Sequence, residues 1–318
     1  GVETALVTGG VTGARRAALA RALAGGEVQV AVGTHALLEP TVAFEDLGLV
    51  VVDEQHRFGV HQRLALTAKG RDAHLLLLTA TPIPRSLARA LDGTLAVSRL
   101  ENRPGLGDNV TTRAVSRARL DTVVDRLVAA VAGGARAFWV CASIAGTDRE
   151  PGAAARHAEL ADRLPGRVAL VTGRLPAEER AAAIAAFSRG ECPVLVATTV
   201  VEVGIDVPDA SIMVVEGAER LGLAQLHQLR GRVGRGGQKA SCLLLHDVPL
   251  SQAQRARLDL LRRCRDGLAL AEADLAARGA GETLGVRQSG GDAFRFLDLT
   301  RDLPALDAWG EVAADGIV

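Results

Sequence analysis

Several residue types are scarce in this sequence of 318 residues. It has no tyrosine and two tryptophans, and of its 37 basic residues only Lys69 and Lys239 are lysine. Acidic residues also number 37, so the formal net charge is zero, and overall positive charge cannot explain any binding of nucleic acid. A basic surface must therefore be local. With 48% hydrophobic and 23% charged residues, the composition is that of a globular protein and excludes a disordered or fibrous one.

Cysteine is also scarce, and Cys141, Cys192, Cys242 and Cys264 are too far apart for the spacing of zinc ligands. We expect them to be reduced. The sequence lacks a run of about 18 apolar residues and an N-terminal signal pattern, so we predict a cytoplasmic protein that is not associated with a membrane. Because the chain begins with Gly1 rather than methionine, we also expect it to be part of a longer protein.

Short β-branched runs alternate with longer Ala-, Leu- and Arg-rich segments of helical period. This alternation predicts an α/β fold with parallel sheets flanked by helices, and the length allows about two domains. The predicted strands are Thr4–Thr8, Val28–Val32, Leu49–Asp53, Leu75–Thr79, Ala137–Cys141, Arg167–Val171, Val194–Thr198, Ile212–Val215 and Ser241–Leu245. The predicted helices are Gly13–Ala24, Arg119–Ala132, Ala153–Leu164, Ala177–Ser188, Gln252–Arg265 and Leu268–Ala277. A turn-rich stretch, Glu101–Gly107, indicates a linker.

Two of the predicted strands run directly into polar residues. The strand that includes Val50–Val52 ends in Asp53 and Glu54, and another leads into Thr79-Ala80-Thr81-Pro82. Ligands of parallel α/β sheets bind beyond the carboxyl ends of strands, so one carboxylate could hold Mg²⁺ and the other could orient water. An Asp-Glu pair on its own is more often a solvated strand end, and the second strand makes the chemical interpretation stronger.

A third segment, Gln225–Gly236, places Arg232 and Arg235 three residues apart among glycines. If this segment is helical, both guanidinium groups lie on one face. Paired arginines can stabilise the charge that develops on a transferring phosphoryl group, and they can equally form salt bridges on a surface helix.

In this order the motifs resemble those of superfamily 2 helicase motors, in which two RecA-like domains hold ATP and nucleic acid. Asp53–His56 is similar to motif II, Thr79–Thr81 to motif III, Ala197–Pro208 to motif V and Gln228–Arg235 to motif VI. Within the superfamily the sequence resembles the bacterial RecG family of branch-migration motors. That likeness extends to Gly33–Leu38, Asp53–Val60, Thr79–Arg85 and Glu219–Gly236. It covers nearly the whole chain.

The C-terminal part resembles the TRG element, a helical hairpin and loop shared by RecG and the transcription-repair coupling factor, through Asp266–Glu282 and Leu284–Gly290. The resemblance divides the chain into a partial first RecA-like domain over residues 1–102, a second over 103–250, and the TRG hairpin with the C-terminal segment over 251–318.

The resemblance also implies roles for individual residues. Asp53 binds Mg²⁺ through water, Glu54 polarises the attacking water, and Arg232 and Arg235 act as arginine fingers. The residues implied to contact ATP are Gln228, Gly204 and Asp206. Those implied to couple the nucleotide site to DNA are Thr79, Thr81, Gln55 and His56. Those implied to contact the DNA backbone are Thr34, His35, Thr198, Thr199, Arg287 and Gln288.

The cofactors implied by the family are ATP and Mg²⁺. The implied partners are branched or duplex DNA such as forks and Holliday junctions, together with single-stranded DNA-binding protein, and the expected state is a monomer. The implied function is an ATP-dependent translocase that remodels stalled forks and Holliday junctions in recombination and repair.

The sequence departs from the family at the phosphate-binding loop, because it contains no G-x-x-x-x-G-K-[ST] motif. Neither Lys69 nor Lys239 has the required neighbours, and Gly9–Gly13 is interpreted as a strand-to-helix connection. The wedge domain of the family is also missing. We therefore expect this chain alone to hydrolyse ATP poorly and to expose apolar sheet surface.

Two other interpretations stay open. One is the motor of the transcription-repair coupling factor, which shares the TRG element. The other is a DNA-binding module without catalysis, which would use the arginine cluster Arg255, Arg257, Arg262, Arg263 and Arg265. The alternative interpretation of that cluster is a solvent-exposed helix face that has no role in binding.

Overall fold

The computed structural model describes residues 1–54, 60–79, 96, 98, 100, 109–142, 146–147, 150–198, 207–267, 269–271 and 273. By its contacts the chain divides into two compact units, Gly1–Ala80 and Thr81–Val318. The predicted linker, Glu101–Gly107, lies outside the described residues. Each unit is described by itself below.

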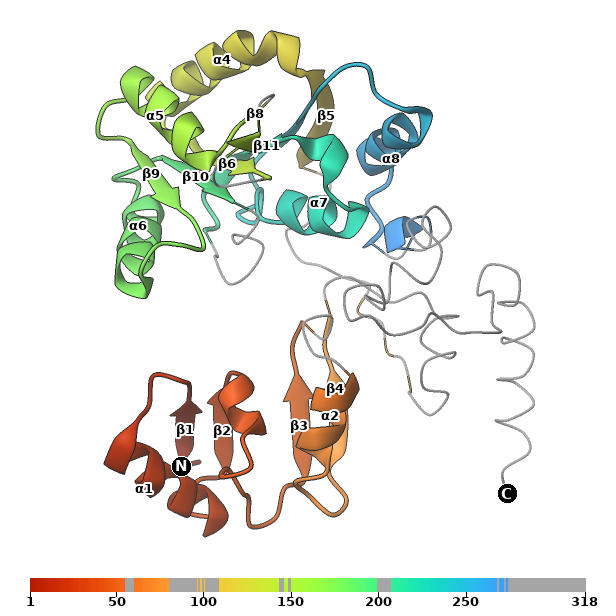
Figure 1. Ribbon diagram of the computed structural model, residues 1–318. Coiled ribbons are helices and arrows are strands. Elements are labelled where there is room, and N and C mark those ends of the chain that lie inside the picture. Colours follow the sequence, from red (N-terminus) through yellow and green to blue (C-terminus); the bar gives the residue numbers. More distant parts are fainter. Residues whose placement is uncertain are drawn as a thin grey trace, which may run out of the picture. The chain divides into compact units, whose positions relative to one another are not determined.

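The first unit contains two pairs of parallel strands. β1 (Thr4–Val7) pairs with β2 (Val30–Gly33), and β3 (Leu49–Val52) pairs with β4 (His74–Leu77). The helices of this unit are α1 (Gly13–Ala24), the 3₁₀ turn η1 (His35–Leu38) and α2 (Val60–Thr67). Figure 1 shows these elements in red to orange. All four strands were predicted within two residues at each end, whereas α2 and η1 were not predicted.

In the described part of the chain, one face of these strands is covered by helices. Val7 packs with Leu23 of α1, and Val50 and Val52 pack with Leu66 of α2. The alternate residues point to the other face and are exposed, which in parallel register places Leu6 beside Val32 and Val51 beside Leu76. The expectation of uncovered apolar sheet surface is therefore confirmed for the first unit.

The second unit is built on a six-stranded parallel sheet with the order β5-β12-β11-β6-β10-β9. Its strands are β5 (Val110–Ser116), β6 (Arg136–Cys141), β9 (Val168–Val171), β10 (Val194–Thr198), β11 (Ala210–Glu216) and β12 (Ala240–His246). A small antiparallel pair, β7 (Gly146–Thr147) and β8 (Glu150–Pro151), lies between β6 and α5 in the chain. β5, the edge strand of the large sheet, was not predicted. Its sequence VTTRAVS has few large apolar residues.

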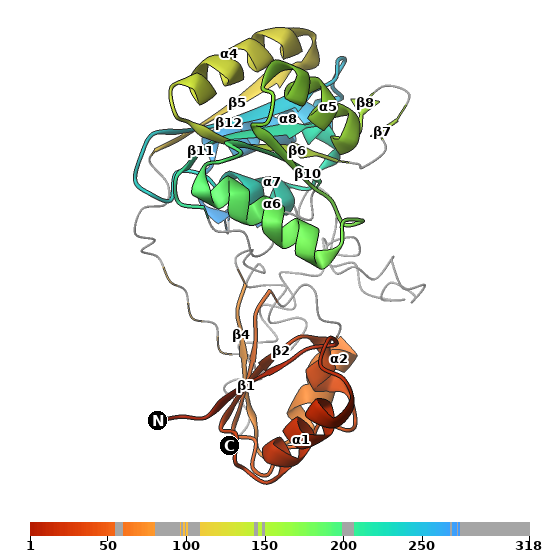
Figure 2. The same ribbon diagram turned by 90° about the vertical axis from the view of Figure 1, so that its left-hand side faces the viewer.

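Helices cover both faces of this sheet (Figure 2). α4 (Leu120–Ala132) and α5 (Ala153–Arg163) lie on one face. α6 (Ala177–Arg189), α7 (Leu223–Arg230) and α8 (Gln252–Arg263) lie on the other. The remaining short turns are η3 (Arg117–Arg119) and η5 (Ala218–Arg220). The predicted α/β class with a parallel sheet between helices is thus confirmed. Of the two predicted C-terminal helices, α8 is present, and the second lies mostly outside the described residues.

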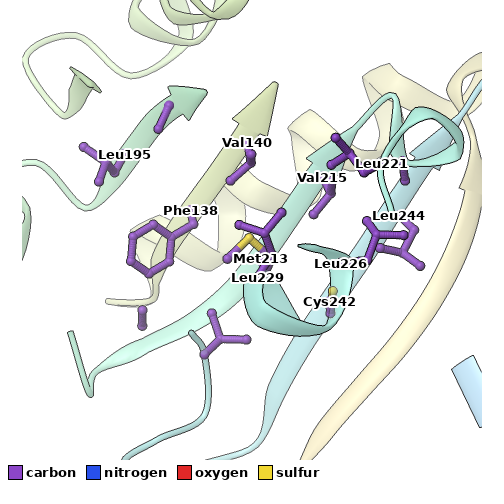
Figure 3. Packing of buried hydrophobic residues seen from close by; sticks show 14 of the residues in the cluster. Phe138, Val140, Leu195, Met213, Val215, Leu221, Leu226, Leu229, Cys242 and Leu244 are labelled. Atoms are coloured by element: carbon purple, nitrogen blue, oxygen red, sulfur yellow. The ribbon is translucent and has the colours of Figure 1, made fainter. Parts of the chain in front are cut away.

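The core follows from alternation along the buried strands. Phe138 and Val140 of β6 point to the α6–α8 face and pack with Met213, Val215 and other residues of that cluster, as Figure 3 shows. Trp139 and Cys141 point to the opposite face, beneath α4 and α5. Because both faces are covered, the strand sequences are almost continuously apolar, as is typical of parallel sheets.

Candidate functional site

The two predicted motifs of the first unit meet at one edge of the β3–β4 pair. Asp53 and Glu54 follow β3 directly, and Thr79 lies just beyond the end of β4. Val52 is in register with Leu77, and the Leu78 N–H donates to the Val52 carbonyl oxygen at 2.8 Å. The structure therefore brings Asp53, Glu54 and Thr79 to the same carboxyl edge.

The backbone at this edge is unusual at Glu54. With φ of 51°, Glu54 is the one non-glycine residue in the described part of the chain that adopts a positive φ. A conformation of this kind costs roughly 1–3 kcal/mol and is concentrated at functional sites. Its N–H donates to Asp53 Oδ1 at 2.8 Å, so the backbone of Glu54 orients the Asp53 carboxylate.

The donor set at Asp53 and Glu54 fits Mg²⁺ held largely through water. Carboxylate oxygens are suitable ligands, and Mg²⁺ usually keeps several waters while using one or two carboxylates. Asp53 is exposed at the end of its strand, where water can reach it. Within the described ranges no cluster of three or more metal-ligating side chains is found, so a closed site made by the protein alone is not indicated there.

Thr34 and His35 lie at the carboxyl end of β2, and both are exposed. The Thr34 N–H donates to the Val7 carbonyl oxygen at 3.1 Å, which continues the β1–β2 pairing. Gly33 is required for this approach, because a Cβ at that position would come within 2.2 Å of the same carbonyl oxygen. Thr34 then precedes the η1 turn, which begins at His35.

The connection between β1 and α1, which the sequence predicted as a strand-to-helix connection over Gly9–Gly13, shares this edge. Gly9 has open space around it, and Gly10 has no neighbour closer than 3.9 Å. Arg16 of α1 donates to the carbonyl oxygens of Thr8 and Val11, each at 3.4 Å, and so fixes the base of the loop.

In the second unit the arginine pair lies beyond a helix. α7 ends at Arg230, and Arg232 and Arg235 occupy the turns that follow, so the condition for placing both on one helical face is not met. Gly231 ends the helix, and the left-handed Gly234, with φ of 75°, reverses the chain.

The turn that carries the arginines is well anchored. The Gly234 N–H donates to the Ala210 carbonyl oxygen at 3.0 Å, and Val233 is fully buried. Arg235 Nε donates to the Gly231 carbonyl oxygen at 2.9 Å. Arg232 and Arg235 are half-buried, as is Gln228 on α7.

Arg230, which was not predicted as a site residue, links α7 to the end of α8. Its Nη1 donates to the carbonyl oxygens of Leu261 at 2.7 Å and Cys264 at 2.8 Å. These carbonyls lie at a helix C-terminus, where a positive charge is favourable. Burial lowers the pKa of Arg230, although the group stays far from neutral at physiological pH. The ring of His227 lies close to Gly267, which follows α8. A Cβ at position 267 would lie only 2.8 Å from that ring.

A second buried arginine was also missed. Arg156 of α5 donates to the carboxylate of Glu216 through Nε at 2.9 Å and through Nη2 at 2.7 Å. The indole of Trp139 donates to the same carboxylate at 3.0 Å, and its ring lies 5.3 Å from the Arg156 guanidinium carbon. Burial lowers the pKa of Arg156, but the hydrogen bond and charge of Glu216 outweigh it, so the pKa is raised overall.

The remaining predicted site residues are Thr198, which the structure describes, and eight residues that it does not describe. Thr198 ends β10 with its side chain buried at 4% exposure and with no hydrogen-bond partner for its hydroxyl oxygen. Outside the described residues lie Gln55, His56, Thr81, Thr199, Gly204, Asp206, Arg287 and Gln288.

A groove of about 490 Å³ opens elsewhere on the second unit, between the start of α8, the segment that leads into it and β5. It is lined by Val248, Pro249 and Leu258 among others and contains none of the residues predicted for ATP chemistry. Within the described residues, none of the helices combines the length and apolarity needed to cross a bilayer.

Comparison with known proteins agrees with these motifs. Residues 2–90 match the DEAD/DEAH box helicase family, and residues 120–237 match the helicase conserved C-terminal domain. The chain is 47% identical over 310 residues to the ATP-dependent DNA helicase RecG of Escherichia coli strain K12, covering 95% of this chain and 45% of that protein. The chain is therefore homologous to part of bacterial RecG over nearly its whole length.

Other matches lead to the same family. RecG of Bacillus subtilis strain 168 is 41% identical over 318 residues, which is 99% of this chain and 46% of that protein. A solved structure of RecG bound to a three-way DNA junction is 39% identical, with a TM-score of 0.70, and the match covers 96% of this chain and 40% of that one. Yeast Dbp5 bound to RNA and ADP BeF3, at 16% identity and a TM-score of 0.59, shows likeness in fold alone. This chain spans less than half the length of the RecG proteins it matches.

Proposed function

We propose that this chain is the motor part of a RecG-type ATP-dependent translocase that acts on duplex and branched DNA, in a cytoplasmic setting. The observation that carries the proposal is the meeting of Asp53, Glu54 and Thr79 at one carboxyl edge, in a chain homologous to RecG over 95% of its length. The RecG relatives named above favour this interpretation over the coupling-factor motor. Remodelling of stalled forks and Holliday junctions is the corresponding cellular role.

The proposed chemistry is ATP hydrolysis. Bound Mg²⁺ supplies charge neutralisation at the phosphates. Asp53 holds the hydrated ion, and Glu54 orients a water molecule for attack at the γ-phosphorus. Arg232 and Arg235 stabilise the negative charge that develops on the transferring group, while Gln228, Gly204 and Asp206 contact the nucleotide. Thr79, Thr81, Gln55 and His56 couple this site to DNA.

The proposed DNA contacts are to the phosphodiester backbone and carry no base specificity. In the first unit they are made by Thr34 and His35, both of which are exposed. The other proposed contacts are Thr198, Thr199, Arg287 and Gln288. Single-stranded DNA-binding protein as a partner and a monomeric state complete the proposal.

We infer further that the 318-residue chain by itself hydrolyses ATP poorly. The sequence has no phosphate-binding loop motif and therefore lacks the lysine of that motif, and Lys69 has partners elsewhere. Its Nζ donates to the carbonyl oxygens of Glu39 at 2.8 Å and Val42 at 2.6 Å, and burial lowers its pKa. A lysine that anchors the backbone in this way is not free to bind phosphate.

The alternative of a DNA-binding module without catalysis has less support, because two members of its arginine cluster are engaged within the protein. Arg257 donates to the Glu219 carbonyl oxygen. Arg262 pairs with Asp259 at 2.6 Å. The Arg257 and Arg262 side chains are therefore held by partners within the protein.

The test is steady-state ATP hydrolysis by the 318-residue chain, with and without a three-way DNA junction. It is run beside a chimera in which the part of Escherichia coli RecG that precedes the matched region is fused to this chain. We expect junction-stimulated hydrolysis by the chimera only, and its loss in the Glu54→Gln chimera. Escherichia coli RecG serves as the positive control.

An inactive chimera that is folded and binds the junction would overturn the proposed function. Junction-stimulated hydrolysis by the 318-residue chain alone would overturn the inference about the missing lysine and would require another phosphate-binding element.

A further inference from the structure

The segment that carries the arginine pair begins where β11 ends. Glu216 is the last residue of β11, and the left-handed Gly217, with φ of 71°, turns the chain into η5 and then α7. Arg232 and Arg235 follow directly after α7. The direction in which the chain leaves Glu216 therefore influences where the arginines lie.

The Glu216 side chain is held from the opposite face of the sheet. Its neighbour Val215 points toward the core that contains α7, whereas Glu216 is paired with Cys141 in register and points toward α5. There Arg156 binds both carboxylate oxygens, which is the fork geometry that only arginine provides. Glu216 is 2% exposed and Arg156 is 0% exposed, so water does not compete for this pair.

Other contacts hold the far end of the same segment. Arg230 donates to the C-terminus of α8, and the Gly234 N–H donates to the Ala210 carbonyl oxygen. At the near end, buried Arg156 and Trp139 donate hydrogen bonds to Glu216, and the Cys141 thiol donates to it at the longer distance of 3.9 Å. Arg117 contributes an ion pair to Glu216 at the longer distance of 3.5 Å.

We propose that Arg156 is a positioning residue that, through Glu216, fixes the start of segment 217–236 and with it the place of Arg232 and Arg235. The catalytic consequence rests on the proposed function, whereas the mechanical part does not. A displacement of a reacting group by about 1 Å can cost about a hundredfold in rate, so a modest loosening at Glu216 is measurable in catalysis.

The mechanical part is tested by hydrogen–deuterium exchange on the 318-residue chain with Arg156→Lys. Lysine retains the charge but not the fork, so the side chain at position 156 can no longer bind both carboxylate oxygens of Glu216 in the geometry that arginine provides. We expect amides in 217–236 to exchange about tenfold faster, while those in 168–189 of β9 and α6 do not change. The control is Glu159→Gln, which removes the half-exposed outer partner of Arg156 and leaves Glu216 bound.

Unchanged exchange in 217–236, or a uniform increase over the whole second unit, would overturn the proposal. Trp139→Phe provides a second variant if Arg156→Lys does not fold, because it removes one donor to Glu216 and keeps an aromatic ring beside Arg156. We expect a smaller increase, about threefold, confined to the same segment. No local increase in this variant would also contradict the proposal.

The catalytic part is tested in the chimera described above. We expect Arg156→Lys to lower kcat about tenfold while KM for ATP and Kd for the junction remain unchanged, since neither ligand touches Arg156. An active chimera whose Arg156→Lys form keeps its kcat would overturn the positioning role. An inactive unmodified chimera would instead contradict the proposed function, and the exchange experiment would still decide whether Arg156 holds the segment.

Discussion

The two units use similar strand sequences in different surroundings. β3 reads Leu-Val-Val-Val and β10 reads Val-Leu-Val-Ala-Thr. Every residue of β10 is buried, because helices cover both faces of its sheet. In β3 the residues alternate, with Val50 at 7% exposure and Val51 at 52%. Apolar composition alone therefore does not determine how much of a strand is buried.

The position of the polar motif residues and the coverage of the sheet by helices are separate features of the two units. Both units place polar motif residues at carboxyl edges of parallel strands, yet only the second unit encloses its sheet. Burial of apolar surface contributes about 25 cal/mol per Å², so we expect the second unit to contribute most of the stability of the chain. The predictions below test this difference in order of decreasing effect.

The largest effect is expected in the doubly covered sheet. Phe138 is fully buried, and its ring centroid lies 4.7 Å from that of Phe187. Phe138→Ala should lower the free energy of unfolding by about 3–5 kcal/mol, measured by urea denaturation, because it leaves a cavity in a closed core. The matched change Leu6→Ala, at a residue 62% exposed, should cost less than about 0.5 kcal/mol. Equal costs would contradict the comparison.

A smaller effect is expected at the β1–β2 edge of the first unit. Gly33→Ala forces a Cβ against the Val7 carbonyl oxygen and should destabilise this unit by about 1–3 kcal/mol. The measurement is the urea transition followed by exchange of amides in residues 1–79. Gly9→Ala is the control, since open space surrounds that position. If both substitutions behaved alike, the close approach at Gly33 would not be a packing constraint.

The pH dependence of the second unit should reflect Cys242. Burial raises the pKa of its thiol from 9.0 to about 12. A group whose pKa is raised on folding stabilises the protein fully below the unfolded value, and this contribution is lost as pH rises between 9 and 12. We expect stability to fall over this window by at most about 1.4 kcal/mol per pH unit. Cys242→Ala should reduce that slope in chemical denaturation, whereas an unchanged slope would contradict the assignment.

The smallest effect on stability is expected at the bare face of the first unit. Replacing Leu6 and Val32 by serine and threonine should change the free energy of unfolding by no more than about 0.5 kcal/mol per site. The same changes should reduce the fluorescence of bound ANS, because this dye binds exposed apolar surface. Undiminished dye binding would show that another surface is responsible.

The sequence predicted the strands of both units because apolar runs bounded by turns are a local signal. It also predicted that Asp53, Glu54 and Thr79 belong to one site, since parallel strands align their carboxyl ends. It did not predict β5, because an edge strand with two threonines and an arginine lacks that signal. It also missed the contacts of Arg156 and Arg230, whose partners lie 60 and 31 residues away, respectively.

Residue order alone determined the alternation of strands and helices, the polar residues at strand ends and the likeness to RecG, because these depend on residue types at short spacing. The tertiary structure decided that the arginine pair follows α7 rather than lying on it, because α7 ends at Arg230 and the left-handed Gly234 allows the chain to turn. It also decided that the six-stranded sheet is covered on both faces, whereas in the described residues the two strand pairs of the first unit are covered on one. The burial of a side chain depends on which distant elements pack against it, and no local pattern specifies that.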